Sequence, residues 1–477
     1  MEIHSLRSSP TLYGDLAEKI LSHIEKGILK PGDRVPSLRN SSSQYQVSLN
    51  TAKEAYFLLE NQGYLESRPQ SGYYVKRTAP PLTPIFVKDF EVGDPRKVSI
   101  CKIYGQLMEG RERGRGESLA VALPDSQLLP KEALAKAMRQ AYKDFPHQCM
   151  HYQMSPGWKP LREEISKRLV ESGVSVSPDD VLITHGASEA LYLAINTLCK
   201  PGDTVAVEGP TYFNFLHMLE TLGLKVLEIP GDPLEGLSVD VLKYALESIS
   251  VKAVIAIPNF SNPLGSRMPD EKKKALTEYL AHKQIPLIED DTYGELSFDS
   301  RRPRTCKSYD TQGNVILCGS LSKTISPGLR IGWAVPGKFF KTMEQLKTLT
   351  NVATSSPNQI AAAIFLAQGG YERHLKKLRF QLARQSGLLR EKVYLSFPPG
   401  TRISRPSGGL VLWVELDEGK DAEKLYQRGI KEGILIAPGT AFSTFQRYKH
   451  CLRLNAGVWN KAVETSVETL GKWAHEI

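Results

Sequence analysis

From about residue 116 onward, short apolar segments of β type alternate with amphipathic helical stretches. This alternation is typical of an α/β domain with a mainly parallel sheet, because parallel strands need long, usually helical, connections. The apolar stretches SGGLVLWVEL and CLRLNA, set between helical segments, predict a smaller α+β lobe over about 370–477. We therefore predict one large domain over 116–477. Its clearest strands are expected at Val181–Thr184, Thr204–Glu208, Ala253–Ile257, Pro286–Glu289 and Val315–Cys318.

The composition excludes several classes of protein. Hydrophobic residues make up 41% of the chain and charged residues 24%, which are ordinary values for a globular protein. No uncharged apolar run approaches the roughly 18 residues that a membrane span needs, and MEIHSLRSSP lacks the apolar core of a signal peptide. The six cysteines are scattered and form no CxxC pair. This pattern is typical of reduced, cytosolic chains, so we predict a cytoplasmic protein with no membrane partner and no metal site.

Residues 11–75 predict a separate unit with its own turn signals. Apolar residues recur at helical spacing over Tyr13–Ile24, and this pattern stops at the turn sequence KPGD. Ser37 is expected to cap a short helix that runs through about Tyr45, and a second helix is expected to start at Ser48 and to end at Asn61–Gly63. YLESR–PQSG–YYVK then predicts a β-hairpin with a Pro/Gly turn. Three helices followed by a two-stranded ribbon is the order of a winged helix-turn-helix domain.

We assign residues 1–77 to this domain and residues 78–115 to a linker. The linker begins with the proline-rich TAPPLTP and ends near the charged, glycine-rich ERGRGE. Neither sequence supports a hydrophobic core, although a short helix is expected near Ile100–Met108. The net charge of +9 allows nucleic-acid binding without establishing it. Residues 1–77 carry ten Lys/Arg against eight Asp/Glu, so evidence for DNA binding must come from local arrangement.

A helix-turn-helix places its second helix in the major groove. Here that helix opens SLNTAKEAY. Asparagine suits a base edge, whereas Ser and Thr suit phosphates. Taken singly, each candidate is more often an ordinary solvated group. The candidate DNA contacts are Ser48, Asn50, Thr51 and Lys53 on this helix, Arg39 on the preceding helix and Arg68 at the wing.

The ordered motifs PGDRVPSLR and SLNTAKEAYFLLENQGYLESRPQSGYYV resemble the GntR family of winged-helix regulators over nearly all of residues 11–76. The resemblance implies DNA binding. The chain departs from the family pattern at Leu49, where arginine is common, and at Gln46, where glycine is common. It also carries Ser41–Ser43 where small apolar residues and leucine are usual.

In the larger domain, five predicted strands each run into a polar motif, and ligands of open α/β sheets bind beyond the carboxyl ends of the strands. The five motifs are HGASEA, GPTYFNF, NFSNPLG, DTYGEL and GSLSKTISPGLRIGW. Together they offer a lysine amine, an acid, donors for a phenolic oxygen and a helix start suited to a phosphate. This inventory suits pyridoxal 5′-phosphate (PLP). Taken alone, Lys323, Asp290 or Asn262 is more often an ordinary loop or turn residue.

SLSKTISPGLRIGW is similar to the lysine signature of class I/II (fold type I) aminotransferases, and the resemblance covers roughly 116–477. It implies that Lys323 is the Schiff-base lysine and that Arg453, in CLRLNAG, binds the α-carboxylate of a substrate or effector. It also implies that Tyr152, in HYQMSPGWKPLRE, reaches the phosphate of a neighbouring subunit, hence a homodimer. The other implied roles are phosphate binding by Ala187, Ser188, Ser320 and Arg330, pyridine-nitrogen binding by Asp290, phenolic-oxygen binding by Tyr293 and Asn262, and ring stacking by Tyr212.

A GntR-type head, a linker and an aminotransferase-like body together resemble the MocR/GabR family of bacterial regulators, and RPQSGYYV is similar to its YdcR-like branch. The resemblance implies a regulator that binds double-stranded promoter DNA and senses an amino compound or PLP. A working aminotransferase with an appended head is the alternative, because no expected catalytic position is missing. A PLP-buffering protein whose head is inert is a third possibility.

Overall fold

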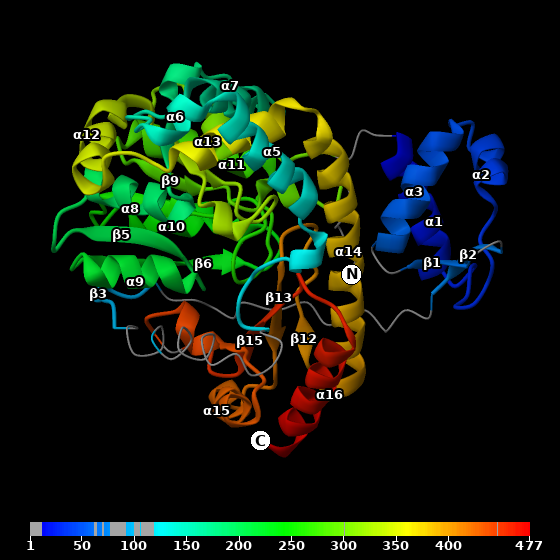
Figure 1. Cartoon of the computed structure of the whole chain (residues 1–477). Helices are drawn as coiled ribbons and strands as arrows, with labels where there is room; N and C mark the ends of the chain where they lie inside the picture. Colours follow the sequence, from blue (N-terminus) through cyan, green and yellow to red (C-terminus); the bar gives the residue numbers. More distant parts are fainter. Residues whose placement is uncertain are drawn as a thin grey trace.

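A computed structural model describes residues 12–61, 64–68, 71–76, 92–99, 105, 119–299, 301–445 and 447–477. Figure 1 shows a small head beside a larger body, with the long helix α14 (Gly370–Ser396) of the body next to the head. Among these residues, no helix is both long and apolar enough to cross a bilayer.

The head confirms the predicted winged helix-turn-helix. It contains α1 (Leu12–Glu25), α2 (Leu38–Gln44), α3 (Leu49–Asn61) and an antiparallel hairpin of β1 (Leu65–Arg68) and β2 (Gly72–Val75). The hydroxyl of Ser37 accepts a hydrogen bond from Asn40 N at 3.2 Å and so caps α2 as expected. The apolar sides of the helices and of the hairpin bury one small core, which includes Leu16, Ile20, Ala52, Tyr56 and Leu59.

Two departures from the GntR pattern have physical explanations in the turn. Gln46 has φ +52°, in the left-handed region that favours glycine. Ser41 is buried because its Oγ lies 2.6 Å from the phenol of Tyr56, which in turn donates to Pro36 O at 2.6 Å. A buried phenol needs such partners, and an apolar residue in place of Ser41 would remove one of them.

The body confirms the predicted mainly parallel sheet. The large sheet runs in the order β3-β6-β5-β8-β9-β10-β11-β4, with β7 paired to β6. The parallel core is β6, β5, β8, β9 and β10, whereas β3, β7 and β11 pair antiparallel. Helices pack on both faces (Figure 1). The strands are β3 (Arg96–Lys97), β4 (Leu182–Thr184), β5 (Thr204–Gly209), β6 (Lys225–Asp232), β7 (Gly236–Leu237), β8 (Ala253–Ala256), β9 (Leu287–Asp290), β10 (Val315–Ser320) and β11 (Gly332–Val335).

The helices of this part come mostly between the strands. The set is α5 (Lys131–Asp144), α6 (Pro146–Met150), α7 (Lys159–Leu169), α8 (Ala187–Leu198), α9 (Phe213–Thr221), α10 (Val239–Ala245), α11 (Asp270–His282), α12 (Phe340–Asn351) and α13 (Ser356–Ala367). After α14 the small lobe forms an antiparallel sheet in the order β12-β13-β15-β14. Its elements are β12 (Arg402–Ile403), β13 (Val411–Glu415), α15 (Ala422–Glu432), β14 (Ala437–Pro438), β15 (Cys451–Asn455) and α16 (Lys461–Glu476).

The linker contributes more to the body than its composition predicts. Its residues Arg96 and Lys97 form β3, which pairs with β6, and Val98 is buried against the core. Strand β6 would otherwise present a row of unpaired backbone groups, and a short added strand covers that edge. The helix expected near Ile100–Met108 lies outside the described residues, apart from the helical Gly105.

Candidate cofactor site and DNA-binding surface

Asp290 is the last residue of β9 and is buried beneath the carboxyl ends of the parallel strands. Thr292 donates to its Oδ1 twice, from the backbone N at 2.9 Å and from Oγ1 at 2.5 Å. Neither of these bonds uses Oδ2. Burial raises the pKa of Asp290 to about 6, although the bonds from Thr292 and the charge of Lys323 act in the opposite direction. A cation placed at Oδ2 would therefore favour the ionised form of this carboxylate and pair with it.

Tyr293, Asn262 and Arg453 form a row next to Asp290. The side chain of Asn262 is hydrogen-bonded to Tyr293, and its Oδ1 also accepts from Nη1 of Arg453 at 3.1 Å. All three side chains are buried. Burial and the nearby phenol of Tyr212 raise the pKa of Tyr293, so its phenol remains a hydrogen-bond donor at neutral pH. The row supplies an amide, a phenol and a guanidinium to one crevice.

Arg453 lies on β15, and 1% of its surface is exposed. Its second described partner is the backbone oxygen of Ala120. Burial lowers the pKa of Arg453 to about 10. Within the described residues no carboxylate pairs with it, so the internal salt bridge that would explain a structural arginine is not seen. Its Nε is buried without a hydrogen-bond partner. This is expected of a guanidinium group that binds an anionic ligand.

Lys323 lies in the turn after β10, and its Nζ donates to Ala122 O at 2.7 Å. The same Nζ is 6.0 Å from the centre of the Tyr293 ring. The backbone oxygen of Ala120 therefore accepts a hydrogen bond from Arg453, and that of Ala122 accepts one from Lys323, so this segment lies along the crevice. Sequence reasoning missed this short segment at the start of the body, because its small apolar residues carry no motif.

The start of α8 forms a second part of the site. The helix begins at Ala187, after Gly186, and no side chain caps it, so the first backbone N–H groups are open to an anion. Nη2 of Arg330 donates to His185 O at 2.7 Å. Gly186 has φ +78°, and a Cβ there would lie 2.7 Å from Nη2 of Arg330. Ser320, at the end of β10, is buried, and its Oγ donates to Ser322 Oγ at 2.7 Å.

The two predicted aromatic residues occupy different surroundings. Tyr212 is half-buried at the start of α9, and its ring centre is 5.0 Å from that of Phe213. Tyr152 is 77% exposed, and no contact among the described residues joins its side chain to the crevice of its own protomer. Its role toward a neighbouring subunit stays a prediction, as do the individual roles of the other site residues.

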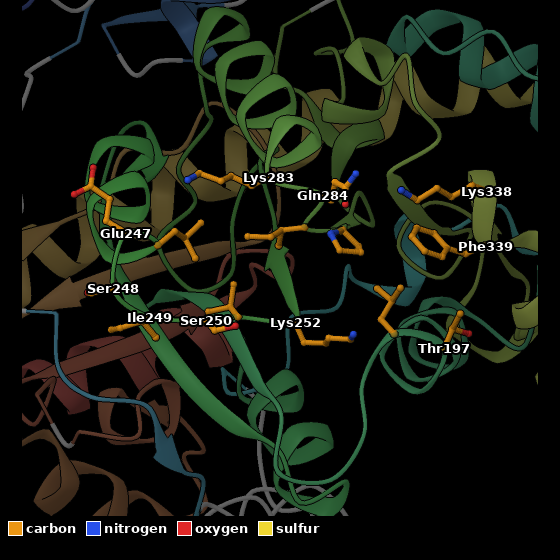
Figure 2. A pocket seen from close by; sticks show the side chains of 15 residues that line it. Thr197, Glu247, Ser248, Ile249, Ser250, Lys252, Lys283, Gln284, Lys338 and Phe339 are labelled. Atoms are coloured by element: carbon orange, nitrogen blue, oxygen red, sulfur yellow. The ribbon is translucent and has the colours of Figure 1, made fainter.

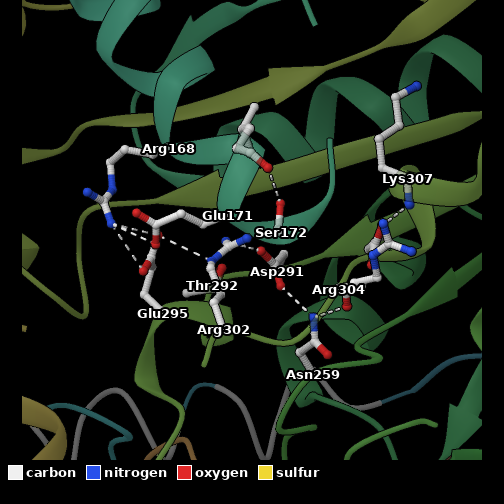
Figure 3. A network of polar contacts seen from close by, with 12 residues as sticks. Arg168, Glu171, Ser172, Asn259, Asp291, Thr292, Glu295, Arg302, Arg304 and Lys307 are labelled. Atoms are coloured by element: carbon white, nitrogen blue, oxygen red, sulfur yellow. Dashed lines mark hydrogen bonds and ion pairs between the residues drawn. The ribbon is translucent and has the colours of Figure 1, made fainter. Parts of the chain in front are cut away.

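A buried ionic network supports the loop that carries Asp290 and Tyr293 (Figure 3). Arg302 contacts Asp291 Oδ2 at 2.6 Å and Glu295 Oε1 at 3.2 Å. Glu295 also pairs with Arg168 at 3.3 Å and with Arg379 at 3.2 Å. Burial acts to raise the pKa of Glu295, but the three arginines outweigh it and hold that pKa below its usual value. The acidic doublet 290–291 and the arginine-rich run RRPR were the only sequence signals of this network.

A separate groove lies at the opposite end of the sheet. It has a volume of about 810 Å³ and is lined by residues that precede β8 and β9, among them Lys252 and Lys283, together with Lys338 (Figure 2). Asp290, by contrast, is at the carboxyl end of β9. This groove therefore plays no part in the crevice around Lys323.

On the head, the start of α3 presents a polar surface. Arg39, Asn50 and Lys53 are exposed. Ser48 caps α3, because its Oγ accepts from Thr51 N at 3.0 Å and lies 2.8 Å from Thr51 Oγ1. Arg68 is bound to Glu66 at 2.6 Å, so a DNA phosphate would have to compete with that acid. Of the predicted contacts, Arg39, Asn50 and Lys53 are the ones whose side chains form no hydrogen bond or ion pair with the residues that the structure describes.

Sequence profiles of two families match the chain. The profile of aminotransferases of class I and II matches residues 121–470, and that of bacterial regulatory proteins of the gntR family matches residues 12–75. Two Escherichia coli K12 proteins, the uncharacterized HTH-type transcriptional regulators YjiR and YdcR, are each 36% identical to it. The matches cover 94% of this chain and 95% of YjiR, and 97% of this chain and 99% of YdcR. The chain belongs to the class I and II aminotransferases, in the MocR-type branch.

The body of this MocR-type chain is also similar to solved aminotransferases. LysN, the α-aminoadipate aminotransferase of Thermus thermophilus, was solved with N-(5′-phosphopyridoxyl)-L-leucine. It is 28% identical, with a TM-score of 0.72, over 78% of this chain and 94% of LysN. PLP is the cofactor of this family, and the crevice fits it: a lysine amine, a buried carboxylate, a phenol–amide pair and an uncapped helix start lie together.

Proposed function

We propose that this protein is a PLP-dependent DNA-binding transcriptional regulator whose body senses an amino compound, or PLP itself, through Lys323. The observation that carries the proposal is that one chain joins a gntR-type head to an aminotransferase-type body. An enzyme does not need such a head. In support, the similarity to YjiR and YdcR extends over the head as well as the body.

The crevice favours a ligand that has both an amine and a carboxylate. Arg453 is buried without an acidic partner among the described residues, and its planar guanidinium suits a carboxylate. When bound, PLP supplies an aldehyde that bonds reversibly to primary amines. Asp290 would hold a proton at the pyridine nitrogen, while Tyr293 and Asn262 would bind the phenolic oxygen. Ala187, Ser188, Ser320 and Arg330 would bind the phosphate, and Tyr212 would pack on the ring.

A homodimer would present two heads to two half-sites of double-stranded promoter DNA. Tyr152 is 77% exposed, Met150 73% and Met154 52%, so an apolar surface beside α6 is open to a second copy. All the cysteines that the structure describes are free thiols, in keeping with a cytoplasmic location.

A working aminotransferase is the alternative function, because no expected catalytic position is missing from the sequence. Two assays on the purified protein separate the two functions. Borohydride should fix the cofactor on the peptide that contains Lys323, and Lys323→Ala should abolish this labelling while the body stays folded. Label on another lysine would contradict the assignment of Lys323.

The second assay compares promoter binding with transamination across a panel of amino compounds. A regulator should change its promoter affinity with a ligand that it does not turn over. Rapid turnover without any change in DNA binding would support the enzyme instead. Genome-wide mapping of the bound DNA would then indicate the ligand through the neighbouring genes.

A further inference from the structure

The head is docked on the body through α3 and α14. The ring of Phe57 on α3 stacks on that of Phe380 on α14, with centroids 5.1 Å apart. Lys76, just after β2, pairs with Glu391 of α14, and Glu54 lies 3.9 Å from Lys376. Figure 1 shows the head against this side of the body. The contacts across this seam therefore include an aromatic stack and charged pairs.

A cavity of about 80 Å³ lies in this seam. Leu58 of α3 lines it from the head, and Ser386 and Arg390 of α14 line it from the body. Arg405 and Ser407, from the loop between β12 and β13, complete the polar part of the wall. Two guanidinium groups and two serines thus face a space that suits a few waters or one small ion.

Neither arginine has an acidic partner within the described residues. Nε of Arg390 is buried and forms no hydrogen bond. The guanidinium of Arg405 lies 4.8 Å from the centre of the Tyr64 ring, on the head. The one carboxylate in the wall, Asp299, is bound to Arg267 at 3.1 Å. Burial, followed by the charge of Arg405, lowers the pKa of Arg390 to about 10.

Arg390 is half-buried with its Nε buried, whereas Arg405 is exposed. Leaving a buried N–H group without a partner is costly, and a second positive charge nearby adds repulsion. An anion bound between the two guanidinium groups would pair with Arg390 and offset that repulsion. Guanidinium groups bind oxyanions through paired N–H donors, and a tetrahedral dianion can engage two of them at once. The cavity is too small for PLP, so the ligand must be a compact oxyanion.

We propose that this cavity binds one small oxyanion of the phosphate class between Arg390 and Arg405, and that the bound ion holds the head against α14. The site shares no residue with the crevice around Lys323. The inference therefore stands or falls independently of the proposed PLP-dependent regulation.

The test uses full-length protein that has been incubated with PLP and then with borohydride, so that a cofactor phosphate site, wherever PLP binds, is already filled. Equilibrium dialysis with inorganic phosphate, at constant ionic strength, should show one saturable site per chain. Arg390→Gln and Arg405→Gln should each weaken binding at least tenfold. Arg384→Gln removes an exposed arginine from the same helix and should leave binding unchanged. Acetate, which carries one charge, should bind more weakly than phosphate.

Hydrogen exchange supplies the second measurement. Phosphate should slow exchange in the α3 peptides of the wild type and of Arg384→Gln, but not in those of Arg390→Gln or Arg405→Gln. Arg405 is exposed on its outer side, so Arg405→Gln keeps the test valid even if Arg390→Gln fails to fold. Absence of saturable phosphate binding would overturn the proposal. So would equal affinity in Arg405→Gln and Arg384→Gln, equal affinity for acetate and phosphate, or binding without any effect on α3.

Discussion

Arg453 is a charged side chain held in a fully buried position by one amide oxygen and one backbone oxygen. Such a position is stable only if the guanidinium gains from its polar contacts, and neither described contact brings a negative charge. A ligand carboxylate would supply that charge.

We predict that Arg453→Ala keeps the cofactor but loses the response to amino acids. The cofactor is expected to depend on Lys323, Asp290 and the phosphate groups, none of which the substitution removes. A charge-assisted contact contributes on the order of 1.5–3 kcal/mol, which corresponds to about ten- to hundredfold in affinity. The measurement is a spectral titration of wild type and variant with an amino-acid panel. A wild-type affinity in the variant would mean that Arg453 is structural.

Asp290 gives a prediction for pH. Burial raises its pKa to about 6 in the free protein, so it is ionised above that pH and neutral below it. The carboxylate, not the carboxyl, pairs with a pyridinium. Cofactor affinity should therefore be full above pH 6 and fall as the pH drops through about 6. Asp290→Asn should bind PLP about tenfold or more weakly at pH 7.5 and show a flatter pH dependence. A pH dependence identical to that of the wild type would contradict this role.

At the scale of single residues, the sequence was sufficient to predict the site residues that lie within one local motif. Lys323, Arg330 and Asp290 lie in local patterns that report their strand ends. Pairs that depend on distant segments were not. Arg390 and Arg405 meet because α14 and the loop before β13 pack together, and Ser41 meets Tyr56 because α2 crosses α3. No local pattern encodes which distant segments come together.

At the scale of the elements, the ion pairs that stabilise the loop after β9 share one acid. Glu295 is the shared partner of Arg168, Arg302 and Arg379. Removing its charge leaves three partly or fully buried arginines without their common partner. We predict that Glu295→Gln lowers the free energy of unfolding by about 3–5 kcal/mol. Because the pKa of Glu295 is lowered in the folded state, the stability it contributes is present above about pH 4.5 and lost as the pH falls further.

Denaturant unfolding of the variant measures this loss. Glu171→Gln is the matched control, since Glu171 is 46% exposed and lies 3.9 Å from Arg168. It should change stability by no more than about 0.5 kcal/mol. Equal effects of the two substitutions would show that the network carries no special share of the stability.

Helix α14 contacts both the cofactor loop and the head through consecutive residues. Arg379 donates to the backbone oxygen of Glu295 at 2.6 Å, and Phe380 stacks on Phe57 of α3. Neighbouring residues project from different sides of a helix, so this one element bridges the two parts. The element order was predictable from the sequence, but the docking of α3 on α14 was not, because exposed faces carry no periodic signal of their partner.

If α14 transmits the signal, Phe380→Ala should uncouple the two parts. Cofactor loading should remain normal, since Phe380 lies on the side of the head. The effect of an amino ligand on promoter affinity should shrink by about 0.5–2 kcal/mol, or roughly two- to thirtyfold. Arg384→Gln on the same helix should leave the effect intact. An undiminished ligand response in Phe380→Ala would exclude this contact as the route.

At the scale of the whole molecule, DNA binding should depend on two heads that act together. Phosphate contacts release counterions, so affinity should fall steeply as salt rises. A dimer should protect two half-sites. Residues 1–77 alone should bind more weakly, because the linkage between the two heads is lost. If residues 1–77 alone protected DNA to the same extent as the full chain, the body would add no linkage between two heads.

The last prediction separates sequence reading from backbone contact. Asn50 is exposed near the start of α3, whereas Ser48 is committed to the cap. If Asn50 reads a base edge, Asn50→Ala should weaken binding to the specific promoter by about 1–3 kcal/mol and leave random DNA unaffected. Lys53→Ala should weaken both alike and reduce the salt dependence by about one ion, because Lys53 is expected on a phosphate. Gel-shift titrations of both variants on promoter and random DNA, at several salt concentrations, provide the comparison. Equal losses for Asn50→Ala on the two DNAs would place Asn50 on the backbone and leave another residue of the head to read the bases.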